Sequence, residues 1–181
     1  MNLTSIEVVT IHPIYNHAFT VSEHPEGQYT HIGDELGCDC VIDNFVDGWK
    51  RRYRNDGRDN EDWYGWGADV LAPFDGIVKS IHINPVTNTP GNIQPSRASS
   101  ISFLGNDDVR VCFAHVMDLS VKEGDTVKAG DIVAKVGNNG FSRNPHIHVG
   151  AWKGNTPLQI RFDLKTMGIQ LKNLGEEMYF L

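Results

Sequence analysis

Short apolar runs separated by turn residues dominate the chain from about residue 68 onward. Examples are ADVLAPFDGIV, ISFLGNDDVRVCFAHV, VKAGDIVAKVG and HIHVGAW. Runs of β-branched residues cut by Gly, Asp, Asn and Pro are typical of antiparallel strands joined by tight turns. The segments at 105–108 and 153–156 lie between such runs, and we predict a hairpin turn at each. Because no part of the chain carries a convincing helical period, the pattern predicts an all-β fold that is mainly antiparallel.

Two longer polar segments interrupt this pattern, at about 44–66 and 85–98. Both are predicted to be long loops, and loops of this length inside a domain often bind ligands. The alternative is that both are insertions without a role. In the first segment, Trp63 and Tyr64 are candidates for binding a substrate by stacking. For Trp63 and Trp66 the alternative is that they anchor the segment onto the rest of the domain.

The length of 181 residues and the hydrophobic fraction of 40% predict a single domain with a sizeable core. We place this core at about 29–163, with an N-terminal extension at 1–28 and a C-terminal tail at 164–181. The formal net charge of -7, without a block of like charges, argues against nucleic acid or an anionic membrane surface as a partner. No apolar run is long enough to span a membrane, and the N-terminus lacks the pattern of a secretory signal, so the location stays unpredicted.

The run CDCVID at 38–43 is predicted to be a strand with one apolar face and one partly acidic face. The two-residue period of a strand places Asp39 and Asp43 on the same face, so either could reach a polar site. The cysteines of this run and Cys112 lack the paired spacing of a structural zinc site and are too few for a disulfide framework. We expect all three cysteines to be small buried apolar residues.

Histidines gather at the ends of the predicted strands. In the stretch NPHIHVG, the strand period places His146 and His148 on one face. His115 follows the run VRVCFA directly, and His31 precedes Asp39 along the chain. Imidazole and carboxylate together form the donor set of catalytic zinc sites, and a further histidine beside such a site could transfer protons. The alternative is that each is a hydrogen-bonded structural histidine, which the grouping of four of them disfavours.

The ordered set of motifs resembles the lysostaphin-type, or LytM-type, zinc metallopeptidases that share a duplicated hybrid motif. The matching features are a His…Asp pair, VLAPFDGIV, the strand end CFAH, the hairpin VKEGDTVKAGDIV and the closing HIH, which cover about 31–152. Each motif is short, and the order of all five carries the resemblance. The resemblance implies a small antiparallel β sandwich or barrel with a groove.

The resemblance also implies an activity and residue roles. A peptidase of this type is a zinc-dependent endopeptidase that cuts cross-link or stem peptides of bacterial peptidoglycan. Zinc would be bound by His31, Asp39 and His148. His115 and His146 would act on the water and on the substrate carbonyl. The expected partner is therefore a peptidoglycan peptide, and we expect a monomer.

Two alternatives stay open. His31 and Asp39 are separated by seven residues, more than this family often has, so Asp34, Glu35 or Asp43 could supply the acidic ligand instead. The second alternative concerns function: a noncatalytic metal-binding module, or a phosphocarrier-like module in which neighbouring histidines would carry a phosphoryl group. A histidine followed by an aspartate upstream favours the peptidase.

Overall fold

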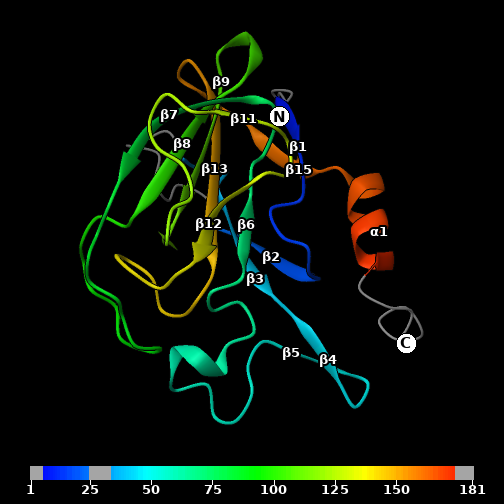
Figure 1. Ribbon diagram of the computed structural model, residues 1–181, viewed down its shortest axis with the longest axis vertical. Helices are drawn as coiled ribbons and strands as arrows, with labels where there is room; N and C mark the ends of the chain where they lie inside the picture. Colours follow the sequence, from blue (N-terminus) through cyan, green and yellow to red (C-terminus); the bar gives the residue numbers. More distant parts are fainter. Residues whose placement is uncertain (1–5, 25–33, 174–181) are drawn as a thin grey trace, which may run out of the picture.

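The computed structural model describes residues 6–24 and 34–173 of the chain. Its largest element is an eight-stranded antiparallel sheet (Figure 1). The spatial order is β11 (Thr126–Val127), β7 (Gly76–His82), β8 (Ser100–Leu104), β9 (Val109–Ala114), β13 (Ile147–Lys153), β3 (Cys38–Ile42) and β2 (Phe19–Glu23), and β14 (Thr156–Pro157) also pairs with β13. The predicted fold, all-β and mainly antiparallel, is confirmed.

Three smaller sheets complete the strand structure of residues 6–24 and 34–173. One contains β10 (Val116–Met117), β12 (Ile132–Val136) and β6 (Asp69–Leu71); one is the parallel pair β1 (Val8–Ile11) and β15 (Gln159–Phe162); and one is the hairpin β4 (Asn44–Val46) and β5 (Trp49–Arg51). The remaining regular elements are the 3-10 turns η2 (Asn60–Asp62) and η3 (Asn106–Asp108) and the helix α1 (Leu164–Asn173).

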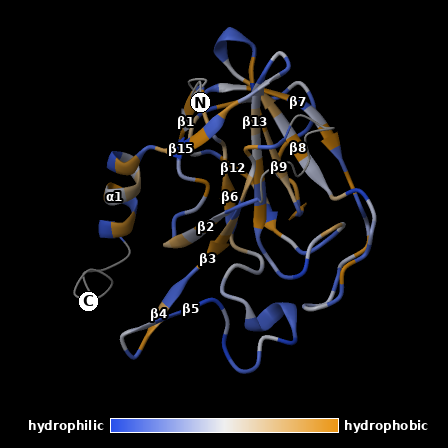
Figure 2. Ribbon diagram, turned by 180° about the vertical axis from the view of Figure 1, so that it is seen from behind, coloured by the Kyte–Doolittle hydropathy of each residue, from blue (hydrophilic) through white to orange (hydrophobic). Residues whose placement is uncertain are grey.

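Side chains from the eight-stranded and the three-stranded sheets share one apolar core. On the neighbouring strands β8 and β9, the fully buried Phe103 and Phe113 meet edge to face, with ring centroids 5.2 Å apart. Figure 2 shows hydrophobic residues along these central strands. Truncating such a buried ring to alanine costs about 3–5 kcal/mol. The core therefore fixes β9 and its other neighbour β13, the two strands at whose ends the predicted site histidines lie.

Residues of the predicted N-terminal extension also form strands that pair with those of the predicted core. β2 pairs with β3 over five residues, and β1 pairs with β15. Between them, the buried Tyr15 donates a hydrogen bond to Cys40 O at 2.8 Å and accepts one from Ile147 N at 3.1 Å. The sequence hid this role because β2 is an edge strand with half-exposed residues, which leaves no clean apolar run.

The segment at 44–66 is not a continuous loop, which corrects the prediction. β4 and β5 form a hairpin whose turn residues Asp47 and Gly48 both have positive φ, 52° and 77°. Asp-Gly is the dipeptide that two-residue hairpin turns favour, so the sequence did carry this signal. The hairpins predicted at 105–108 and 153–156 are present as β8–β9 and β13–β14, and 85–98 contains no strand or helix.

Helix α1 lies beside the sheets within the predicted C-terminal tail (Figure 1), and the sequence pattern did not predict it. Its first turn is capped by Asp163, whose carboxylate accepts from the backbone N–H groups of Lys165 and Thr166. None of its residues is buried, which explains why no clear helical period marks it. Among the described residues, no helix is long and apolar enough to cross a membrane.

Candidate metal and catalytic site

His148 and Asp39 face each other across two paired strands. The register between β13 and β3 places His148 opposite Asp39, and both alternate with buried apolar neighbours. Their side chains therefore leave the same face of the sheet, and His148 Nδ1 lies 3.0 Å from Asp39 Oδ1. The strand period predicted each orientation separately, and the register brings the two side chains together.

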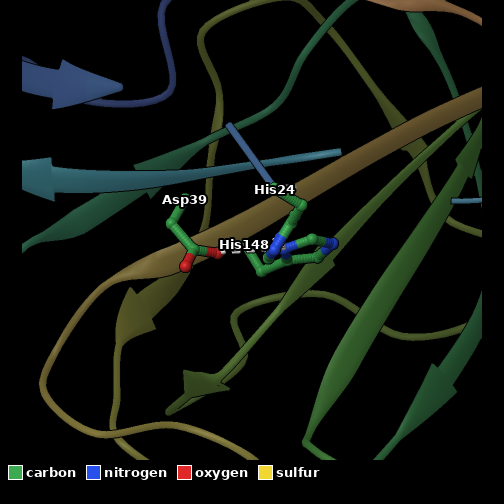
Figure 3. Close-up of side chains that lie close together, drawn as sticks. All are labelled: His24, Asp39 and His148. Atoms are coloured by element: carbon green, nitrogen blue, oxygen red, sulfur yellow. Dashed lines mark hydrogen bonds and ion pairs between the residues drawn. The ribbon is translucent and has the colours of Figure 1, made fainter. Parts of the chain in front are cut away.

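His24 joins this pair from the end of β2. In the ladder between β2 and β3, Glu23 lies opposite Cys38, so the next residue lies beside the start of β3. His24 Nε2 lies 3.1 Å from His148 Nδ1 and 3.6 Å from Asp39 Oδ1, and the two imidazoles lie side by side (Figure 3). Within the part of the chain that the structure describes, this trio is the one group able to hold a metal ion.

The three donor atoms have a spacing that suits a tetrahedral metal ion. They are separated by 3.0, 3.1 and 3.6 Å. Bonds of about 2.0–2.1 Å at tetrahedral angles separate ligand atoms by about 3.3 Å. Two imidazoles and a carboxylate are also the donor chemistry of catalytic zinc sites, which keep a fourth position open. The residues of this donor triangle, His24, Asp39 and His148, therefore fit such an ion.

Asp39 and His148 stabilise each other's charged forms. Burial opposes the charge on Asp39, but hydrogen bonds to His146 and His148 outweigh it and lower the pKa of the carboxyl group well below its usual value. Burial also opposes the charge on His148, yet hydrogen bonds to Asp34 and Asp39 raise its pKa to about 10. At neutral pH, a metal ion that binds His148 would therefore displace a proton from it.

His115 ends β9 in a conformation that its surroundings enforce. Its φ of 68° lies in the left-handed region, which residues other than glycine rarely adopt. Its backbone N–H donates to Ser99 O, and its Nδ1 donates to Asn139 O at 2.8 Å, so Nε2 is left as an acceptor. Burial, together with His146 and His148, lowers the pKa of His115 well below its usual value. The ring is therefore neutral at pH 7.

His146 lies against both His115 and the donor triangle. Its Nδ1 lies 2.7 Å from Asn144 O, and because a carbonyl oxygen can only accept, Nδ1 carries a proton. Its Nε2 lies 3.4 Å from Asp39 Oδ1. The rings of His146 and His115 lie 4.6 Å apart between centroids. Two further imidazoles are thus held beside the donor atoms.

One pocket of about 440 Å³ opens over the donor triangle and this histidine pair. Arg52, from the segment at 44–66, and Ile93, from the loop at 85–98, contribute to its wall. Phe141 and Arg143, which precede β13, complete the wall with one apolar and one cationic side chain. The two segments that the sequence marked as binding loops therefore each supply a residue to the rim of this pocket.

Four residues singled out from the sequence line this pocket together: Asp39, His115, His146 and His148. His31, the predicted third metal ligand, lies outside the described residues. The roles assigned to all five remain predictions.

The other acidic candidates do not contribute to the donor triangle. Asp43 lines a second cavity, where it pairs with basic side chains, and Glu35 is exposed. Asp34 contacts His148, but at Nε2, on the opposite side of the ring from Asp39. Asp39 is therefore the carboxylate that belongs to the donor triangle.

Trp63 and Tyr64, the predicted substrate-binding residues, do not line the pocket. Trp63 Nε1 donates to Gly57 O at 3.0 Å, and its ring lies 5.0 Å from that of Tyr53. The Arg54 guanidinium lies over the Tyr64 ring at 5.0 Å. These contacts of Trp63 lie within the segment, whereas Tyr64 also packs against the apolar core. The substrate-binding role of both residues stays a prediction.

His24 and the contact of Asp34 with His148 are absent from the set predicted from the sequence. For His24 a signal existed, because it directly follows the run FTVSE as His115 follows VRVCFA. Its assignment to an N-terminal extension concealed it. For the role of Asp34 there was no signal, because contacts between a loop residue and a strand depend on how the chain folds back.

The chain belongs to peptidase family M23. The family model matches residues 62–160, more than half of the chain. The matched region contains His115, His146 and His148, whereas Asp39 precedes it. The resemblance found in the sequence is confirmed, and membership of a family with metalloprotease relatives implies a metal ion.

Three curated relatives match parts of the chain. An uncharacterized metalloprotease of Buchnera aphidicola subsp. Baizongia pistaciae is 30% identical over 115 residues, which are 63% of this chain and 30% of the relative. Lysostaphin of Staphylococcus simulans is 41% identical over 84 residues, 46% of this chain and 17% of the relative. The glycyl-glycine endopeptidase ALE-1 of Staphylococcus capitis is 41% identical over 84 residues, 46% of this chain and 23% of the relative. The chain thus spans less than a third of the length of these relatives.

The solved catalytic domain of the prophage-encoded M23 protein EnpA from Enterococcus faecalis, a mutant form, has the same fold. The TM-score is 0.50 at 22% identity, and the match covers 79% of this chain and 87% of that domain.

Proposed function

We propose that this protein is a zinc-dependent endopeptidase that hydrolyses peptide bonds in bacterial peptidoglycan. The observation that carries the proposal is one pocket that joins the donor triangle to a pair of further histidines, His115 and His146. Zinc is proposed because two imidazoles and a carboxylate with an open position are its usual catalytic ligand set. The substrate is proposed from the relatives, which include lysostaphin and a glycyl-glycine endopeptidase.

Two of the proposed zinc ligands are Asp39 and His148. For the third, the geometry favours His24 and the sequence resemblance favours His31. Both candidates are histidines, so the donor chemistry is the same with either. Zinc titration of His24→Ala and His31→Ala separates them, because the variant that lacks the true ligand loses tight binding whereas the other retains it.

The histidine pair is suited to proton transfer. A bound zinc ion supplies the Lewis acidity that makes water nucleophilic at neutral pH and polarises the scissile carbonyl. His115 is neutral and has Nε2 as an acceptor, so it can take a proton and later deliver it to the leaving amine. His146, whose Nε2 lies beside Asp39 in the same pocket, would hydrogen bond the developing oxyanion in its doubly protonated form, because Nδ1–H is already engaged by Asn144 O.

The pocket wall favours a peptide that carries both a carboxylate and an apolar side chain. Arg143 is exposed, and no ion pair engages it among the described residues. Arg52 lies 3.7 Å from Asp43 and is therefore partly neutralised. Phe141 is exposed next to Arg143 on the same wall. We therefore propose stem-peptide segments over pure glycine bridges as the preferred substrate.

The decisive assay measures new amino termini released from purified peptidoglycan. The expected result is release by the zinc-loaded protein, loss with a chelator, recovery with added zinc, and no release by Asp39→Ala. Peptidoglycans with glycine bridges and with directly linked stem peptides are compared in parallel. A zinc-loaded protein that releases no termini from either would instead be a noncatalytic metal-binding module.

The phosphocarrier alternative fits the site less well. A phosphoryl group on His146 Nε2 would lie next to the Asp39 carboxylate, whose oxygen is 3.4 Å from that nitrogen. Two negative groups at this separation in a partly buried site repel each other strongly. Acid-labile phosphohistidine after incubation with phosphoryl donors would support this alternative.

A further inference from the structure

The Asp34 carboxylate lies against the side of the His148 ring that faces away from the donor triangle. Asp34 Oδ2 is 2.5 Å from His148 Nε2, whereas His148 Nδ1 faces Asp39 Oδ1 at 3.0 Å and His24 Nε2 at 3.1 Å. A neutral imidazole has one N–H and one lone pair. If the N–H is on Nε2 and donates to Asp34, the lone pair on Nδ1 points into the donor triangle.

The space around Asp34 is shaped by two glycines. A Cβ on Gly150 would overlap Asp34 Oδ1, and one on Gly37 would lie 2.6 Å from the same atom. Neither glycine adopts the left-handed φ that would itself require glycine. The lack of a side chain at both glycines therefore leaves room for the Asp34 carboxylate. Gly150 lies on β13, two residues from His148.

The Asp34 carboxylate also loses much of its contact with water, which is unfavourable for a charged group. Its side chain is only 12% exposed, and among the described residues its Oδ1 is buried without a hydrogen-bond partner. A buried carboxylate oxygen without a partner is unfavourable. Among residues 6–24 and 34–173, the contact of Oδ2 with His148 is the one side-chain hydrogen bond that offsets this cost.

We propose that Asp34 is a positioning residue for His148. It accepts the Nε2–H and so selects Nδ1 as the metal-binding atom, in the way that carboxylates commonly orient metal-binding histidines. This inference rests on the proposed metal site. It also gives the two carboxylates beside His148 separate tasks, since Asp39 belongs to the donor triangle and Asp34 orients the ring from the other side.

The experiment combines zinc affinity with the protonation pattern of the ring. Zinc is titrated into the full chain in competition with a chromophoric chelator, and the tautomer of His148 in the zinc-loaded protein is read from long-range ¹H–¹⁵N NMR spectra. We expect wild type to bind about one zinc with His148 protonated at Nε2. Asp34→Ala is expected to bind the same amount of zinc about 10- to 100-fold more weakly.

Four further variants guard against a folding artefact. Gly150→Ala displaces the carboxylate without removing it and should also weaken zinc binding, whereas Gly168→Ala, where a Cβ meets nothing within 4 Å, should not. Asp59→Ala removes an exposed aspartate of the 44–66 segment and should leave the affinity unchanged. Asp34→Asn, which retains an acceptor without the charge, should lose less affinity than Asp34→Ala.

The outcomes separate this inference from the proposed function. Unchanged zinc affinity in Asp34→Ala, or a wild-type His148 protonated at Nδ1 with zinc bound, would overturn the positioning role alone. Complete loss of zinc in Asp34→Ala, as in Asp39→Ala, would make Asp34 a ligand and also overturn it. A wild-type protein that binds no zinc would overturn the proposed metal site and the role of Asp34 together.

Discussion

Side chains on the paired strands of the site are held differently from those at its border. Asp39 and His148 are fixed by the register between β3 and β13, and His115 and His146 are fixed by backbone acceptors at strand ends. His24 and Asp34 instead adjoin the stretch 25–33, outside the regular strands. The strand-borne part is therefore a frame held by strand pairing and hydrogen bonds within the protein, whereas the bordering part completes the donor set and orients it.

This difference separates chemistry from binding. The strand-borne histidine pair can transfer protons without contributing a donor atom to the triangle. The bordering residues can change how tightly a metal is held without touching the pair. Substitutions in the two parts are therefore expected to move different observables.

The largest expected effect is on turnover in the strand-borne part. His146→Ala should lower the rate of peptidoglycan hydrolysis by about 100- to 10,000-fold, the usual contribution of general acid and base catalysis. Its zinc content should stay at the wild-type level because His146 is outside the donor triangle. Release of amino termini and metal analysis on the same sample check both points, with His82→Ala on β7 as the control. Loss of zinc together with activity would place His146 among the ligands.

The next effect concerns metal affinity and pH. His148 has a pKa raised to about 10 in the metal-free protein, so at lower pH a metal ion must displace its proton. The apparent zinc affinity should therefore rise by about tenfold per pH unit from pH 7 toward pH 10. Zinc titrations by calorimetry in buffers of different ionisation enthalpy should show about one proton released at pH 7.5. An affinity independent of pH, with no proton release, would contradict the interpretation of this site.

A smaller effect is expected on stability at the end of β9. The buried Asn139 side chain accepts from Ser99 N at 2.7 Å and donates to Val116 O at 2.9 Å. It thereby links Ser99, whose carbonyl accepts from His115 N, to Val116, the residue that follows His115. Asn139→Ala should lower the free energy of unfolding by about 1–3 kcal/mol, because it leaves buried backbone groups without partners. Urea unfolding of this variant beside the exposed Asn92→Ala measures the difference. Equal stability of the two would show that the strand end is held by other contacts.

The smallest effect is an expected absence of change. Cys38 and Cys40 are buried, and burial raises the pKa of Cys112 to about 12. If the strand frame is independent of the metal, none of the three thiols should react with a thiol reagent at pH 8, with or without zinc. Mass spectrometry after labelling, with urea-denatured protein as the positive control, measures this. Rapid labelling only in the metal-free protein would show that the frame itself needs the ion.

The same division decides what could be predicted from the sequence. The two-residue period of a strand was enough to put His146 and His148 on one face and Asp39 on the outward face of its strand. The sequence did not predict that His148 and Asp39 lie opposite each other, because this depends on which strands pair and in which register. The edge strand β2 carries half-exposed residues, so neither it nor His24 stood out. The place of Asp34 depends on space left by Gly37 and Gly150, which no local pattern encodes.

The central claim is tested most directly by the metal content of the purified protein after zinc loading and desalting, measured for wild type, Asp39→Ala, His148→Ala and His146→Ala. We predict close to one zinc per chain in wild type and His146→Ala, and loss of tightly bound zinc in the other two. Full zinc retention by His148→Ala, or no zinc in wild type, would contradict the claim that these strands carry a catalytic metal site.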